Sequence, residues 1–155
     1  MGRALRGTSL ADYGISQERY VMLKNFCKQY AEARQRLKYG ANAARIEKTI
    51  TGNTPTDPTA NAAIINAAYL NQIDAIEAAI YKATRDYPGE VTQAVFLTLT
   101  EGIPAAYVDA PICDSDISAL RRLALFYLDQ YITAAIGEYL TIPAEDRPKK
   151  ALFRA

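Results

Sequence analysis

The chain has 155 residues, and half of them are hydrophobic, which is enough for one domain whose core needs neither disulfides nor a metal. Eighteen Lys and Arg against 17 Asp and Glu leave a net charge of +1, which removes the compositional argument for a strongly basic nucleic-acid binder or an acidic disordered tail. The sequence contains no histidine, so Ser/His and Cys/His catalysis and histidine-ligated metals are excluded.

The two cysteines, Cys27 and Cys113, form no CxxC motif and cannot build a zinc site without histidine. Each follows an apolar run, which predicts a reduced, partly buried thiol. No unbroken apolar stretch has the length of a membrane span, and the N-terminus lacks the apolar region of a signal peptide. We therefore expect a cytoplasmic protein that makes no contact with membranes and holds no cofactor.

Charge is unevenly spread along the sequence. Residues 19–55 carry eight Lys or Arg against two Glu, whereas residues 56–116 carry nine acids against two bases. One interpretation is that two solvated helix faces attract each other in the fold. The other is that the basic third forms a surface for a phosphate backbone.

The N-terminal third is predicted to form a long amphipathic helix over 16–39, with Ser16 as its N-cap and Gly40 as its stop. Its apolar stripe recurs every three or four residues: Tyr20, Leu23, Cys27, Tyr30, Arg34 and Leu37. Residues 41–50 form either a continuation or a shorter helix, which completes a basic N-terminal helical part over 13–50. The polar stretch 51–56 is the best linker candidate in the chain.

A second long helix is predicted from Pro58, preceded by Asp57 as N-cap, to about residue 85. Its apolar stripe is Ile65, Tyr69, Ile73, Ile76, Ile80 and Ala83. Residues 90–100 are rich in β-formers, but their alternation is too imperfect for a strand. A short helix at most is expected over 105–110, a final helix over 115–136, and a mobile tail over 138–155.

The final helix is predicted to be capped by Asp114 and Asp116, which are more plausible as capping residues than as metal ligands or catalytic acids. Its core stripe is Ile117, Leu120, Ala124, Tyr127, Leu128 and Tyr131. Leu123 and Phe126 lie off this stripe, so the helix is apolar around most of its circumference. They are covered either by another helix of the same subunit or by a second copy, and we favour a homo-oligomer.

The sequence resembles a phage family in three places. The first is Tyr13 to Tyr30, the second is Asp57-Pro58-Thr59-Ala60 opening a helix that carries Ile76-Glu77, and the third joins Pro111-Ile112-Cys113 to Leu120-Arg121-Arg122 and Phe126-Tyr127-Leu128. Together these stretches resemble the RinA/ArpU-type activators of late genes in phages and prophages of Gram-positive bacteria. The resemblance spans about residues 13 to 131.

This resemblance implies a helix-turn-helix, similar to sigma-factor region 4, over 90–136 within a helical core at 57–137. Residues 90–101 would be the supporting helix, 102–114 the turn and 115–136 the recognition helix. The positions that would face DNA are Ser115, Ser118, Ala119, Arg121 and Arg122. Lys24 and Lys28, one turn apart on the first helix, would contact the phosphate backbone.

The sequence thus predicts a single all-α domain, a small helical bundle that acts as a DNA-binding regulator of phage genes and recruits the host RNA polymerase. The competing interpretation is a helical interaction or assembly protein of a phage that does not bind DNA. It is favoured by the near-neutral charge and by Asp114 and Asp116 at the start of the recognition helix. An enzyme is not expected, because the chain has no histidine, no glycine-rich phosphate loop and no paired cysteines.

Overall fold

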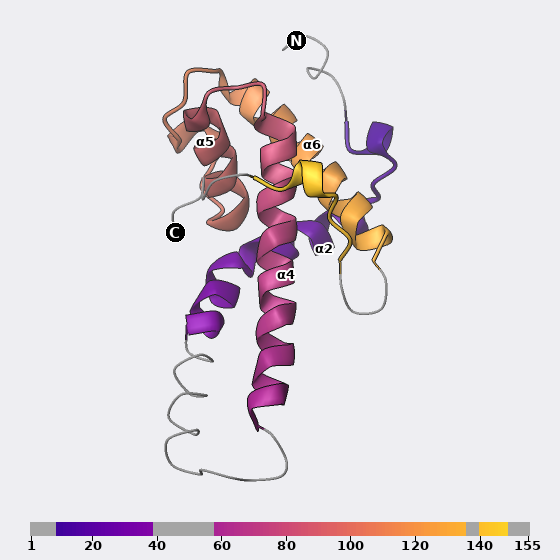
Figure 1. The fold of residues 1–155 in the computed structure, drawn as a ribbon. Coiled ribbons are helices and arrows are strands. Elements are labelled where there is room, and N and C mark those ends of the chain that lie inside the picture. The colour runs from indigo at the N-terminus through magenta and orange to yellow at the C-terminus, as the bar shows by residue number, and fades with distance from the viewer. Residues whose placement is uncertain (1–8, 39–57, 136–139, 149–155) are drawn as a thin grey trace.

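A computed structural model describes residues 9–38, 58–135 and 140–148. Its main helices are α2 (Gln17–Lys28), α4 (Pro58–Thr84), α5 (Gly89–Thr100) and α6 (Asp114–Thr133). Residues 30–38 are also helical, and three short 3-10 turns complete the order: η1 (Ala11–Tyr13), η2 (Ala105–Tyr107) and η3 (Ala144–Asp146). The described ranges contain no strand, so the predicted all-α class is confirmed (Figure 1).

The core forms where α6 packs against α4, α5, α2 and η2, and where α4 in turn packs against α5 and η3. Figure 1 shows α4 running through the middle of the molecule, with its N-terminal half extending beyond α5 and α6. The largest fully buried side chains come from every main helix: Tyr30, Phe96, Leu23, Ile76, Ile80, Leu99, Ile117, Leu120, Leu125, Leu128, Val91 and Val95. This core contains most of the predicted apolar stripes, but Ile65 of the predicted α4 stripe is 53% exposed and lies outside it.

The first predicted helix is interrupted. Ser16 is its N-cap as expected, because the side-chain oxygen accepts a hydrogen bond from the Arg19 amide at 3.1 Å. At Gln29 the backbone makes a tighter turn, in which the Gln29 amide donates to the Phe26 carbonyl at 3.2 Å, and helix resumes over residues 30–38. The prediction of one continuous helix over 16–39 is therefore wrong at this turn. Gly40, the segments 41–50 and 51–56, and Asp57 lie outside the described residues.

Helix α4 begins at Pro58, the predicted first helical position, and ends at Thr84. Helix α5 forms despite its β-branched residues because most of its side chains are buried in the core. The hydroxyls of Thr98 and Thr100 donate to the carbonyls of Val95 and Phe96 at 2.8 Å, which satisfies these buried polar groups within the helix.

Helix α6 is shorter than predicted, ending at Thr133 instead of residue 136, and it begins at Asp114. Its N-cap is Cys113, whose side chain accepts no capping hydrogen bond. The prediction that Asp114 and Asp116 cap the helix is therefore wrong. Asp114 is the first residue of the helix and Asp116 is the third. Both carboxylates lie in the first turn, where they interact favourably with the helix dipole.

The C-terminal segment packs against the bundle over residues 140–148 instead of extending as the tail that the sequence predicts. Asp146 is only 3% exposed and accepts hydrogen bonds from Lys82 Nζ at 3.0 Å and from the Tyr131 hydroxyl at 2.9 Å. The Asn71 side chain bonds both the amide and the carbonyl of Leu140. Side chains of α4 and α6 thus provide the partners that hold this segment in place.

Candidate nucleic-acid interface

The start of α6 presents some of the residues that the resemblance assigns to DNA contact. Ser115 is exposed, and Ser118 and Arg122 are partly exposed. Their spacing of three and four residues places them on one side of the helix. Ala119, by contrast, is 1% exposed, so its side chain is not accessible to a base edge in this conformation.

Arg121 lies on the inner side of α6, close to α2. Its Nε atom is buried and has no hydrogen-bond partner in the part of the chain that the structure describes. The Cys27 thiol is buried, and this burial raises its pKa to about 12, against an opposing effect of the nearby Arg121 guanidinium. Cys27 is therefore the buried free thiol that the sequence predicts, whereas Cys113 is exposed and departs from that prediction. Arg121 is directed into the bundle more than toward solvent.

Helices α2 and α6 pack against each other and run antiparallel. At one end of the pair, Arg19 Nε donates to Asp129 Oδ1 at 2.5 Å, and at the other end Cys27 lies near Arg121. The C-terminal half of α2 therefore lies beside the N-terminal half of α6. Lys28, however, lies beside Gly102 at the C-terminal end of α5, whereas the segment that leads into α6 shares a cleft with Glu90 at the N-terminal end of α5.

Both predicted backbone-contacting lysines belong to that half of α2. Lys24 is partly exposed, with its Nζ 5.7 Å from the centre of the Tyr20 ring. Lys28 is exposed and reaches toward the turn after α5, where its Cε would lie 3.7 Å from a Cβ built on Gly102. Gly102 has φ +70°, which explains the glycine at this turn.

Carboxylates lie at the start of α6. Asp114 is exposed, and Asp116 accepts a hydrogen bond from Cys113 Sγ at 3.1 Å. The segment just before α6 lines a surface cleft of about 320 Å³. The residues of this cleft are Glu90, Asp109, Ala110 and Pro111. Two carboxylates in the first turn of α6 repel phosphate and reduce the net attraction of this end for DNA.

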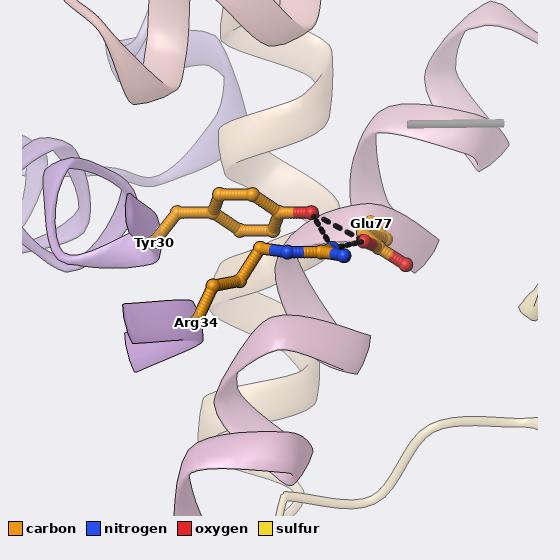
Figure 2. Close-up of polar contacts among 3 residues, drawn as sticks. All are labelled: Tyr30, Arg34 and Glu77. Atoms are coloured by element: carbon orange, nitrogen blue, oxygen red, sulfur yellow. Dashed lines mark hydrogen bonds and ion pairs between the residues drawn. The ribbon is translucent and has the colours of Figure 1, made fainter. Parts of the chain in front are cut away.

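The basic first third and the acidic middle of the sequence meet in one cluster, formed by Tyr30, Arg34 and Glu77 (Figure 2). The Tyr30 hydroxyl donates to Glu77 Oε1 at 2.5 Å, and Arg34 Nη1 lies 2.7 Å from the Tyr30 oxygen and 3.3 Å from Glu77 Oε1. Burial raises the pKa of Tyr30 and also that of Glu77, the latter against the opposing effects of Tyr30 and Arg34. Arg34 is thus paired with α4, as expected if the oppositely charged segments attract each other.

The two predicted interface residues of α6 are partly buried against the core. The Phe126 ring stacks on Tyr13, with 4.9 Å between ring centres and 26° between planes, and lies 5.7 Å from the Tyr127 ring. The segment before α2 therefore covers Phe126 within the same subunit. Leu123 packs against the same core.

Sequence reasoning missed the cluster of Lys82, Tyr131 and Asp146, whose members lie in three separate elements. Lys82 also places its Nζ 4.7 Å from the centre of the Tyr127 ring. The only local signal was Ile142 and Asp146 within a proline-containing stretch that otherwise reads as a tail. These two residues do not predict the cluster by themselves, because its other members come from α4 and α6, whose positions the local sequence does not give.

The described residues contain no group of three or more His, Cys, Asp or Glu side chains placed to hold a metal ion. Among the described helices, none combines the length and apolar character needed to cross a membrane. Compared with protein-family models, with curated proteins and with solved structures, the chain gives no match.

Proposed function

We propose that this protein is a DNA-binding regulator of phage genes in which the N-terminal half of α6 enters a major groove. The observation that supports this proposal is the row of Ser115, Ser118 and Arg122, which are exposed or partly exposed on one side of the first turns of α6. The regulation of phage genes and the recruitment of the host RNA polymerase rest on the sequence resemblance.

In the proposed complex, Ser115, Ser118 and Arg122 face the groove, and Arg122 contacts a base edge or a phosphate. Lys24 and Lys28 contact the phosphate backbone without reading its sequence. Asp116 limits the affinity, because its carboxylate lies in the first turn of the same helix. Ala119 makes no contact with DNA in this arrangement, since it is buried.

The test is the salt dependence of binding to duplex DNA from the late-promoter region of the source phage, measured by fluorescence anisotropy. Arg122→Ala and Lys28→Ala should each weaken binding and reduce the slope of log affinity against log salt by about one unit. Asp116→Asn should strengthen binding. Lys38→Ala serves as the matched control, because Lys38 is exposed but belongs to the helical stretch after the Gln29 turn.

The second candidate is a helical interaction or assembly protein of a phage that binds no DNA. It is favoured by the burial of Ala119 and by the two carboxylates in the first turn of α6. Absence of binding to the promoter DNA at low salt, for the wild-type protein and for Asp116→Asn alike, would support this candidate and contradict the first one.

A further inference from the structure

The α4 extension, defined here as residues 63–70, is an apolar helix surface that the described bundle leaves exposed. Ile64 is 56%, Ile65 53% and Leu70 50% exposed, although the predicted core stripe of this helix included Ile65. Ile73, Ile76 and Ile80, further along the same helix, are buried. Figure 1 shows why, since this half of α4 extends past α5 and α6.

The extension adjoins the packed part of α4, and Tyr69 within it already packs against the core. Asn71 is hydrogen bonded to Leu140, and the Gln72 side chain donates to Gln29 at 3.0 Å. Ile64, Ile65 and Ala68 lie immediately before these contacts, and their spacing of one, three and four residues places them on one side of the helix. Clustered exposed isoleucines of this kind indicate a surface that a partner covers.

The charge pattern identifies the kind of partner. From Pro58 to Ile73 the sequence contains no Asp, Glu, Lys or Arg, although 23% of the whole chain is charged. A nucleic acid or a charged protein surface would find no complementary charge here, and an interfacial membrane helix normally carries Lys or Arg on its polar face. At a two-fold axis each residue approaches its own copy, where a charged side chain would repel itself. A charge-free apolar helix surface is therefore complementary to itself.

We infer that the α4 extension is a homodimer interface, in which Ile64 and Ile65 of one subunit pack against the same helix of a second copy. Ala63, Ala67 and Ala68, which flank this pair in the sequence, allow the two helices to approach closely. A pair of single helix faces offers less area than a standard interface, so the dissociation constant should be on the order of micromolar. This inference is independent of DNA binding.

The experiment is sedimentation equilibrium of the full chain at concentrations from about 1 to about 200 µM, chosen to span a micromolar dissociation constant. The wild-type protein should shift from monomer to dimer over this range. Replacing both Ile64 and Ile65 with Glu should weaken the dimer by at least about 100-fold, because four charges would then meet at the axis. Val21→Glu is the matched control: Val21 is also an exposed apolar residue but belongs to α2, so the dimer should remain.

Replacing Ile64 and Ile65 with Ala keeps the helix propensity and should weaken the dimer by about 10-fold, which tests the interface if the Glu variant loses helix. Circular dichroism of each variant checks that loss. The inference is overturned if the wild-type protein remains monomeric at the highest concentration. It is also overturned if a dimer forms whose affinity neither pair of substitutions changes, since the interface would then lie elsewhere.

Discussion

Glu77 shows how a single carboxylate can be both paired and destabilised. It accepts hydrogen bonds from Tyr30 and Arg34, yet its pKa is raised because burial outweighs the favourable contacts. The arginine of this group is partly exposed, which reduces the value of the ion pair. Glu77 therefore contributes specificity to the packing of residues 30–38 on α4, while its ionisation opposes folding at neutral pH.

This raised pKa predicts a pH dependence of stability. A carboxyl group whose pKa is higher in the folded state binds its proton more tightly there than in the unfolded chain. The stabilisation that protonated Glu77 gives the folded state is therefore fully present below about pH 4.5, and it is lost as the pH rises through the pKa of Glu77 in the folded protein. Replacing Glu77 with Gln should remove this loss. Urea unfolding at pH 4.5 and 7 should show a smaller decline in the free energy of unfolding for Glu77→Gln than for the wild type.

Glu32→Gln is the control for this comparison, because Glu32 and its partner Arg36 are both exposed. Its pH dependence should match that of the wild type. Equal declines for the wild type and for Glu77→Gln would show that the ionisation of Glu77 is not coupled to folding.

At the scale of elements, local sequence signals predicted where most helices lie. They did not predict the contacts between segments that are far apart in the sequence. Pro58 and the periodic isoleucines were sufficient to predict the bounds of α4, because helix starts and amphipathic patterns depend on residues close together in the sequence. The break at Gln29 was not predictable, since no Gly or Pro marks it. In the candidate site, the resemblance assigned Ser115 and Ala119 to the same DNA-facing side, but Ser115 is exposed and Ala119 is buried, because burial depends on which segments cover α6.

The docking of η3 is another such long-range feature, and it predicts a large effect from one substitution. Asp146→Ala would leave the Lys82 ammonium and the Tyr131 hydroxyl without their shared acceptor. Removing one partner of a buried ion pair typically costs about 3 kcal/mol of unfolding free energy. Chemical denaturation should report this loss, and Glu145→Ala, at the exposed neighbouring position, should change stability by less than about 0.5 kcal/mol. A silent Asp146→Ala would mean that the segment does not dock in solution.

At the scale of the molecule, α6 is the element around which the others are arranged. It packs against α4, α5, α2 and η2, and Tyr13 of η1 covers its Phe126 ring. Its exposed residues include Asp114 and Ser115 in the first turn, where the proposed DNA contacts lie, and Gln130 and Thr133 near its other end. The α4 extension is at a different place, so dimerisation and DNA binding need not compete.

The enclosure of α6 predicts the effect of replacing Leu123 and Phe126 with Glu. Both side chains pack against the core, so two carboxylates there should lower the free energy of unfolding by at least about 3 kcal/mol. Gln130→Glu, at an exposed position of the same helix, should be nearly neutral. Urea titration measures both. An unchanged midpoint for the double variant would show that this side of α6 is open to solvent.

The contact between Asp146 and the pair Lys82 and Tyr131 also has a kinetic consequence. Asp146 follows both partners in the chain, so during synthesis α4 and α6 can pair before η3 is available to join them. If docking of η3 comes after the transition state for folding, its loss should accelerate unfolding and leave the folding rate nearly unchanged. Docking of η3 would then slow the unfolding of the native state and have little effect on the rate at which it folds.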